Sequence, residues 1–230
     1  IKQLTPQIPD SINQSAVLVV EKAKADSEVF KYVHWWITYT YETSKIMGMD
    51  EVFVHMVEKY YMTGQAYWMD STQLVKIVDR ARKIAPNIIG NTAPELALKD
   101  TSGKWQILSK VPAKYTILVF YDPDCGHCQK EMPKLKEVYD KWKSKGVEVY
   151  AVDIEVDVPK WKKFIREKQL NWINVNDANH QSNFRQLYDI YSTPVIYILD
   201  DKKVIKAKRI GADQIDDFLN HLEGVKVGKS

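Results

Sequence analysis

The fold of this chain is decided by the stretch Tyr115-Thr-Ile-Leu-Val-Phe-Tyr-Asp-Pro-Asp-Cys-Gly-His-Cys-Gln-Lys-Glu-Met-Pro133. Residues 116–121 are apolar, β-branched or aromatic without a break, which predicts a strand buried on both faces. Residues 122–124 (Asp-Pro-Asp) end that strand, because proline cannot donate a ladder hydrogen bond and aspartate favours turns. Cys125 and Cys128 then open a helix. A strand, a tight turn and Cys-x-x-Cys at a helix start together predict a redox-active dithiol.

The two cysteines are expected to have different roles. Unpaired N–H groups and the positive end of the helix dipole favour a thiolate at Cys125, which we expect to attack a substrate disulfide. Cys128 lies one turn inward and is expected to resolve the mixed disulfide. A structural zinc site needs more ligands, and covalent haem attachment needs histidine where Gln129 stands. We therefore expect no metal and no cofactor.

Side chains beside Cys125 are expected to modulate its pKa in opposite directions. The imidazole of His127 can favour the thiolate, whereas the carboxylate of Asp124, like that of Asp122, disfavours it. The sequence does not determine the net shift of the pKa. A solvent-facing spacer is the alternative interpretation of His127.

Several separated motifs carry a resemblance that runs from about Ile88 to the C-terminus. They are Gly90-Asn-Thr-Ala-Pro-Glu-Leu96, Gly103-Lys104, Cys125-Gly-His-Cys128, Glu131-Met-Pro133 and Thr193-Pro194. In these motifs the chain resembles thioredoxin-fold thiol-disulfide oxidoreductases of the extracytoplasmic, membrane-anchored TlpA/ResA-like group. The Cys-Gly-His-Cys sequence is also similar to that of protein disulfide isomerases, whereas thioredoxin has proline at the position of His127.

The resemblance implies a fold, an activity and partners. The fold would be α/β and thioredoxin-like, a mixed sheet with helices on both faces, which also suits the alternation of strands and helices along residues 87–230. The activity would be disulfide exchange with protein substrates that carry cysteines or disulfides, sustained by an upstream thiol redox partner. The location would be periplasmic or otherwise extracytoplasmic, and the sequence leaves open whether reduction or oxidation dominates.

Thr193-Pro194 matches the family's cis-proline beside the dithiol. The cis bond would turn the backbone so that Thr193 can pair with a substrate strand, and a cis bond costs far less before proline than elsewhere. An ordinary trans proline at a strand start is the alternative.

Glu131 is a candidate proton acceptor for Cys128. Thioredoxin carries a buried aspartate on the strand before its dithiol, and that position here is Val119. Glu131 follows Cys128 by three residues, which places both side chains on one helix face, and the TlpA/ResA-like group has a glutamate there too. We expect this carboxylate to lie against the sheet with its pKa raised by desolvation. A solvated glutamate on the helix surface is the alternative.

The first 86 residues predict a separate domain. Four amphipathic segments with capping residues such as Asp70 and with Pro86 as a final helix stop indicate a small all-α domain over 1–86, before the thioredoxin-like domain over 87–230. The segment also looks like uncharacterised helical domains that precede such modules in secreted proteins of Gram-negative anaerobes. Its many aromatic residues indicate either core packing or a groove for a partner.

Composition excludes some classes of protein. Two cysteines cannot form a disulfide-stapled scaffold, and a net charge of +3 without basic runs among aromatics argues against nucleic-acid binding. The chain has no signal peptide or membrane-length apolar run and begins at Ile1. We expect a targeting segment to have been removed, and membrane contact only through a tether absent from this sequence.

Two other functions stay open from the sequence. A peroxiredoxin-type peroxidase is favoured by the similar opening at residues 90–96, but its motif needs proline and then threonine or serine where Leu118 and Asp122 stand. A binding module would use the aromatic helical domain to capture a partner, with the dithiol sensing redox state.

Overall fold

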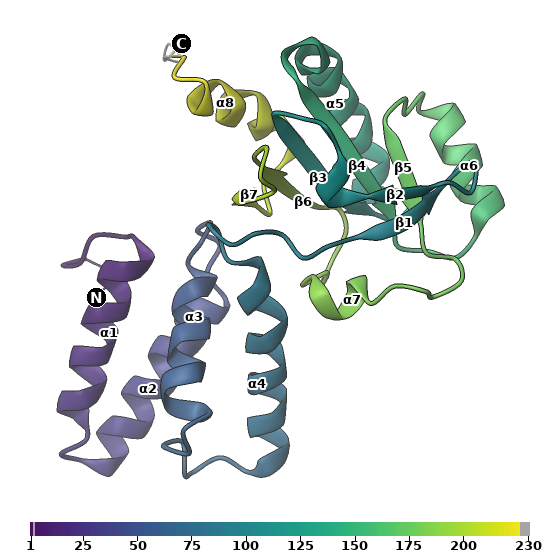
Figure 1. Ribbon diagram of the computed structural model, residues 1–230. Helices are drawn as coiled ribbons and strands as arrows, with labels where there is room; N and C mark the ends of the chain where they lie inside the picture. The colour runs from purple at the N-terminus through teal and green to yellow at the C-terminus, as the bar shows by residue number, and fades with distance from the viewer. Residues whose placement is uncertain (2, 226–230) are drawn as a thin grey trace. The chain divides into compact units, whose positions relative to one another are not determined.

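The computed structural model describes residues 1 and 3–225, and its contacts divide the chain into two compact units (Figure 1). The units are Ile1–Ile88 and Ile89–Ser230, so the division falls two residues after the predicted boundary. It comes just beyond the 3-10 turn Ala85–Asn87, which contains Pro86 and follows the last helix of the first unit. Each unit has its own hydrophobic core.

The first unit is all-helical. Its helices are α1 (Pro9–Ala23), α2 (Ser27–Glu42), α3 (Asp50–Met56) and α4 (Ser71–Ile84). Asp26 and Asp70 cap α2 and α4 by accepting backbone N–H groups. The first helix begins at Pro9, whose fixed φ suits a first helical position.

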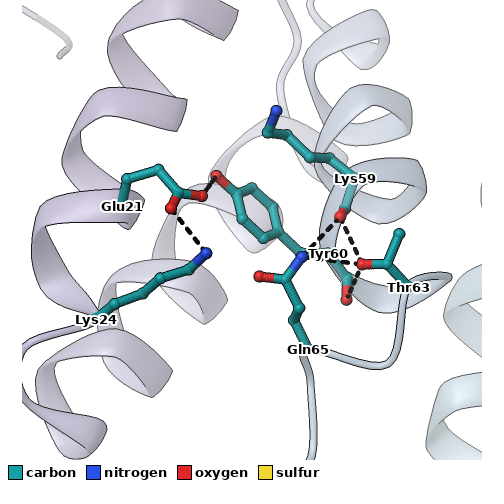
Figure 2. Close-up of polar contacts among 6 residues, drawn as sticks. All are labelled: Glu21, Lys24, Lys59, Tyr60, Thr63 and Gln65. Atoms are coloured by element: carbon teal, nitrogen blue, oxygen red, sulfur yellow. Dashed lines mark hydrogen bonds and ion pairs between the residues drawn. The ribbon is translucent and has the colours of Figure 1, made fainter.

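A π-helical turn, Val57–Tyr61, continues α3 and links it to α1 through one polar cluster. Figure 2 shows the Tyr60 hydroxyl donating to Glu21 Oε1 at 3.0 Å, while Lys24 pairs with the same carboxylate at 2.7 Å. The side chains of Thr63 and Gln65 donate to the Lys59 carbonyl at 2.7 and 3.2 Å and so close the turn.

The second unit is one mixed sheet of seven strands in the order β2-β1-β5-β4-β3-β6-β7, as the described residues show it. Its strands are β1 (Ala97–Asp100), β2 (Trp105–Ile107), β3 (Tyr115–Tyr121), β4 (Val147–Asp153), β5 (Ile173–Asn176), β6 (Val195–Leu199) and β7 (Ile205–Lys208). Its helices are α5 (Gly126–Trp142), α6 (Val158–Glu167), α7 (Phe184–Leu187) and α8 (Ala212–Leu222). Helices α5, α6 and α8 pack in the core of one face and α7 packs in that of the other, which is the predicted α/β arrangement.

Strand β3 lies inside the sheet and leads directly to the dithiol. It pairs in parallel with β4 and antiparallel with β6, and six of its seven residues are buried. Helix α7 spans only four residues, Phe184–Leu187. The Asp177 carboxylate accepts the N–H groups of Gln181 and Ser182, and these bonds hold the preceding residues in a loop.

Candidate dithiol active site

Cys125 occupies the N-cap of α5, and its half-buried thiol lies beside the proline loop. The thiol donates to the Thr193 carbonyl oxygen at 3.3 Å. The pKa of Cys125 is lowered, first by a hydrogen bond with the Thr193 side chain and then by the backbone N–H groups of Cys128 and His127. The helix start therefore stabilises a thiolate on this sulfur.

Cys128 is fully buried under the same helix turn. Its sulfur accepts the backbone N–H of Asp122 at 3.5 Å, and both thiols are free in this structure. Burial raises the pKa of Cys128 to about 12, opposite to the shift at Cys125. The pair thus combines one half-buried thiol that ionises readily with one buried thiol that does not readily lose its proton.

Thr193 and Pro194 lie next to the dithiol although Thr193 is 68 residues from Cys125 in the chain. The Thr193–Pro194 peptide bond is cis, and both residues are half-buried. Strand β6 begins directly after them and pairs with β3, which brings the loop to the end of the sheet where the cysteines lie.

The charged residues around Cys125 are partly neutralised. Asp124 is exposed and forms an ion pair with Lys160 of α6, so a cation offsets the charge that was expected to disfavour the thiolate. The Asp122 carboxylate accepts the N–H of Asp124 at 2.7 Å, as expected of a turn. His127 is exposed, and the modulating role of its imidazole stays a prediction.

Glu131 does not have the raised pKa that the sequence analysis expected. Its side chain is 23% exposed, it pairs with Lys134 at 2.7 Å, and it accepts the backbone N–H of Ala212 at 3.1 Å. The hydrogen bond from Lys134 is the main reason that the pKa of Glu131 is lowered, with the Ala212 N–H in addition. These partners stabilise the carboxylate and make it a weaker base.

Sequence analysis missed a second carboxylate at the same end of the sheet. Asp153, the last residue of β4, is 1% exposed, and burial raises the pKa of its carboxyl to about 7. The available signal was an aspartate that directly follows the apolar run 149–152.

No group of three or more His, Cys, Asp or Glu side chains that could hold a metal ion occurs among residues 1 and 3–225.

Comparison with known proteins identifies the family. Residues 89–208 match the AhpC/TSA family. Thiol-disulfide oxidoreductase ResA of Geobacillus kaustophilus is 30% identical over 138 residues, which are 60% of this chain and 78% of the relative. ResA of Bacillus subtilis is 30% identical over 134 residues, 57% of this chain and 74% of the relative.

Solved structures extend the comparison to both units. A domain of a possible thiol-disulfide isomerase from Cytophaga hutchinsonii is 49% identical, with a TM-score of 0.57, over 60% of this chain and 94% of that one. A thioredoxin-like protein from Bacteroides caccae has a TM-score of 0.75 at 21% identity, over 91% of this chain and 76% of that one, and shows a shared fold. The predicted resemblance, fold class and enzyme class are confirmed. The chain belongs to the AhpC/TSA family and is a TlpA/ResA-like, thioredoxin-fold thiol-disulfide oxidoreductase.

Proposed function

We propose that this protein is an extracytoplasmic oxidoreductase that exchanges disulfides with protein substrates through Cys125 and Cys128. The observation that carries the proposal is the opposite shift of the two pKa values, lowered at the half-buried Cys125 and raised to about 12 at the buried Cys128. Such a pair separates attack from resolution, because the thiolate is the nucleophile in each step.

The reaction follows from this arrangement. The Cys125 thiolate attacks one sulfur of a substrate disulfide, and the other substrate sulfur leaves as a thiolate. Cys128 then loses its proton and attacks the Cys125 sulfur, which releases the first substrate sulfur and leaves a Cys125–Cys128 disulfide. An upstream thiol partner returns the pair to the dithiol. The reverse sequence oxidises a substrate dithiol, so the same residues serve either direction.

The substrate polypeptide would lie along the loop at Thr193 and Pro194. The Thr193 carbonyl lies 3.3 Å from the Cys125 sulfur, so a chain paired with this backbone would present its own sulfur to Cys125. His127 and Asp124 complete the proposed site as modulating residues, and Glu131 is kept in it only as a positioning group that contacts the start of α8.

The proposed location rests on the resemblance to the TlpA/ResA-like group. None of the helices described over residues 1 and 3–225 combines the length and apolar character that crossing a bilayer requires.

Disulfide reduction of insulin and consumption of hydrogen peroxide, measured side by side, test the proposed function. We expect insulin reduction by the parent protein, none by Cys125→Ser, and a stable mixed disulfide with Cys128→Ser. Native substrates can be identified from that mixed disulfide. Peroxide consumption without insulin reduction would instead support a peroxidase, and loss of both activities would support a binding module.

A further inference from the structure

The proline loop, residues 188–194, carries Thr193 to the dithiol and lies partly at the surface. The side chain of Tyr191 is 85% exposed, whereas Thr193 and Pro194 are half-buried. The substrate path proposed above needs the Thr193 backbone to stay beside Cys125, where its carbonyl lies 3.3 Å from the sulfur. A surface loop keeps such a position when the more rigid structure around it holds its ends.

Arg209 is bonded to the chain on both sides of this loop. Its guanidinium pairs with the carboxylate of Asp189, the second residue of the loop. Its backbone N–H donates at 2.8 Å to the carbonyl of Ile196, the second residue of β6, just after the loop. One residue therefore connects the start of the loop with the strand that follows it.

The position of Arg209 is itself fixed by its surroundings. Arg209 directly follows β7, which pairs with β6, and its φ of +54° lies in the left-handed region that few residues other than glycine adopt. Such a conformation persists where neighbouring contacts determine it. Three residues further on, the Ala212 N–H donates to Glu131 of α5 at 3.1 Å, so the connection from β7 to α8 is attached to the helix of the dithiol as well.

The burial of the two side chains explains why the pair is formed. The side chain of Asp189 is only 5% exposed, and a buried carboxylate is costly without a charged or hydrogen-bonding partner. The side chain of Arg209 is 38% exposed, and its guanidinium stays charged at every pH that the protein meets. The partly exposed cation thus draws the buried start of the loop toward the end of β7.

We propose that Arg209 is a positioning residue for disulfide exchange, a role that rests on the proposed function: through its ion pair with Asp189 it holds the proline loop so that the Thr193 backbone lies beside the Cys125 sulfur. Arg209 acts on the reaction through the loop. A protein substrate needs that loop to align its own backbone, whereas a small disulfide without a backbone does not.

Reduction of insulin and of 2-hydroxyethyl disulfide, measured side by side, tests the proposal with Asp189→Asn and Arg209→Asn. Asparagine is chosen at position 209 because it tolerates the left-handed conformation. Each rate is divided by the fraction of Cys125 that is ionised. We expect kcat/KM for insulin to fall by ~10-fold or more in both variants, because the loop is misplaced. The value for 2-hydroxyethyl disulfide should change by less than ~2-fold.

Glu223→Gln is the matched control, since it removes another ion pair of the same unit. Glu223 pairs with Lys114 at 2.6 Å, and Lys114 directly precedes β3, so this pair lies at the end of that strand opposite to the dithiol. Both activities should stay within ~2-fold of the parent. Arg209→Lys keeps a cation at position 209 and should stay within ~3-fold of the parent for insulin. A loss as large as that of Arg209→Asn would mean that the charge does not hold the loop, and would overturn the proposal.

The pH dependence of Cys125 labelling by iodoacetamide gives the ionised fraction and a second test that needs no substrate. A hydrogen bond with the Thr193 side chain is the main reason that the pKa of Cys125 is lowered. The midpoint of labelling should therefore rise in Asp189→Asn and Arg209→Asn, where the loop is released, and stay unchanged in Glu223→Gln.

The outcomes separate this proposal from the proposed function. A parent protein that does not reduce insulin overturns disulfide exchange, while the labelling midpoint still tests the hold on the loop. An unchanged midpoint in Asp189→Asn, together with an unchanged ratio of the two activities, overturns the role of Arg209 alone. Asp189→Asn decides the question even if Arg209→Asn fails to fold, because it leaves no buried charge and the partly exposed Arg209 can be hydrated.

Discussion

Each unit contains a titratable side chain that is almost completely buried, His34 in the first and Asp153 in the second, and the surroundings of these two side chains differ. His34 of α2 is 0% exposed and its ring contacts those of Phe30, Tyr60, Tyr61 and Trp68. Neither ring nitrogen has a hydrogen-bond partner among the described residues, and burial lowers the pKa of His34 to about 4. Asp153 accepts two neutral N–H groups, and its pKa is raised to about 7.

The difference shows what burial is used for in each unit. Both environments favour the neutral form, but only Asp153 is left with a pKa at which its charge can change near neutral pH. His34 remains neutral well below that range and acts as an aromatic filler of the helical core. Asp153 has hydrogen-bond donors and a pKa at which its charge can change, whereas His34 is surrounded by aromatic rings and stays neutral.

Replacing Asp153 with asparagine should give the largest change in stability. A carboxyl whose pKa rises from 3.8 to about 7 on folding binds its proton more tightly in the folded state, so stability is lost as pH rises through that window. The loss is on the order of 4 kcal/mol. The stability of Asp153→Asn can be measured by urea unfolding at pH 4 to 8, followed by hydrogen exchange in the second unit. We expect that it does not fall with rising pH as the stability of the parent does.

Asp100→Asn is the matched control for that experiment. Burial opposes ionisation there too, but hydrogen bonds from Ser102 and Gln106 outweigh it and hold the pKa of Asp100 at about 2. This variant should lose stability near neutral pH, where Asp153→Asn gains it. If the stability of the two variants changes with pH in the same way, the pKa values of Asp153 and Asp100 are not shifted in opposite directions.

His34→Phe should give the next largest change, with the opposite dependence on pH. The unfolded state takes up a proton near pH 6.5 while folded His34 resists it down to about pH 4, so stability is lost as pH falls through that window. The loss is about 3 kcal/mol. Hydrogen exchange in the helical unit should show it for the parent and not for His34→Phe.

His55→Gln is the control for His34, since burial also lowers the pKa of His55 but its side chain is only half-buried. That variant should keep most of the acid-induced loss. An unchanged loss in His34→Phe would mean that another group causes it.

Much of this fold could be predicted from the pattern of neighbouring residues. The surroundings of Glu131 and Asp153 could not, because they depend in part on residues that are distant in the chain. The apolar run before Cys125, the turn after it and the helical spacing beyond it are properties of neighbouring residues. The raised pKa expected for Glu131 was wrong because Lys134, three residues further on, pairs with its carboxylate, and because the Ala212 N–H, from a residue 81 positions away, also donates to it. The spacing of Cys128 and Glu131 shows that they share a helix face, but not what packs against that face.

The aspartate at position 153 ends an apolar run in the sequence, but its place in the sheet could not be predicted, for a related reason. That place depends on the parallel register with Tyr121, which is 32 residues earlier and separated from it by the whole of α5. Registers of parallel strands are set by packing of the connecting helix rather than by a local turn. The proline loop could be placed beside Cys125 only through the family resemblance.

Rates of alkylation compare the two cysteines of the dithiol, whose pKa values are shifted in opposite directions. The pKa of Cys128 is about 12 and that of Cys125 is below the ordinary thiol value of 9.0, so their thiolate populations differ by ~1000-fold or more. The stronger intrinsic nucleophilicity of the more basic thiolate offsets ~30-fold of this. Iodoacetamide near neutral pH should therefore label Cys125 at least ~30-fold faster, by mass spectrometry of the two labelled forms.

Cys125→Ser is the control for that labelling, because it leaves Cys128 as the only thiol. Cys128 should stay slow in this variant. Equal labelling rates for the two cysteines would contradict the assignment of attacking and resolving roles.

The smallest effect on stability is expected from Tyr60→Phe. This variant tests whether a buried ring with a hydrogen-bonded hydroxyl behaves differently from the ring of His34. Tyr60 packs edge-on against His34 with ring centroids 5.1 Å apart, and its hydroxyl donates to Glu21 (Figure 2). Removing that hydroxyl should cost ~1 kcal/mol near neutral pH, since the bond to a carboxylate is lost at the edge of the core. Tyr67→Phe, which removes an exposed hydroxyl, should change stability by less than ~0.5 kcal/mol. Hydrogen exchange in the helical unit compares both variants with His34→Phe. If Tyr60→Phe stabilises the unit as much as His34→Phe does at low pH, the two buried polar groups are equivalent and hydrogen bonding does not distinguish them.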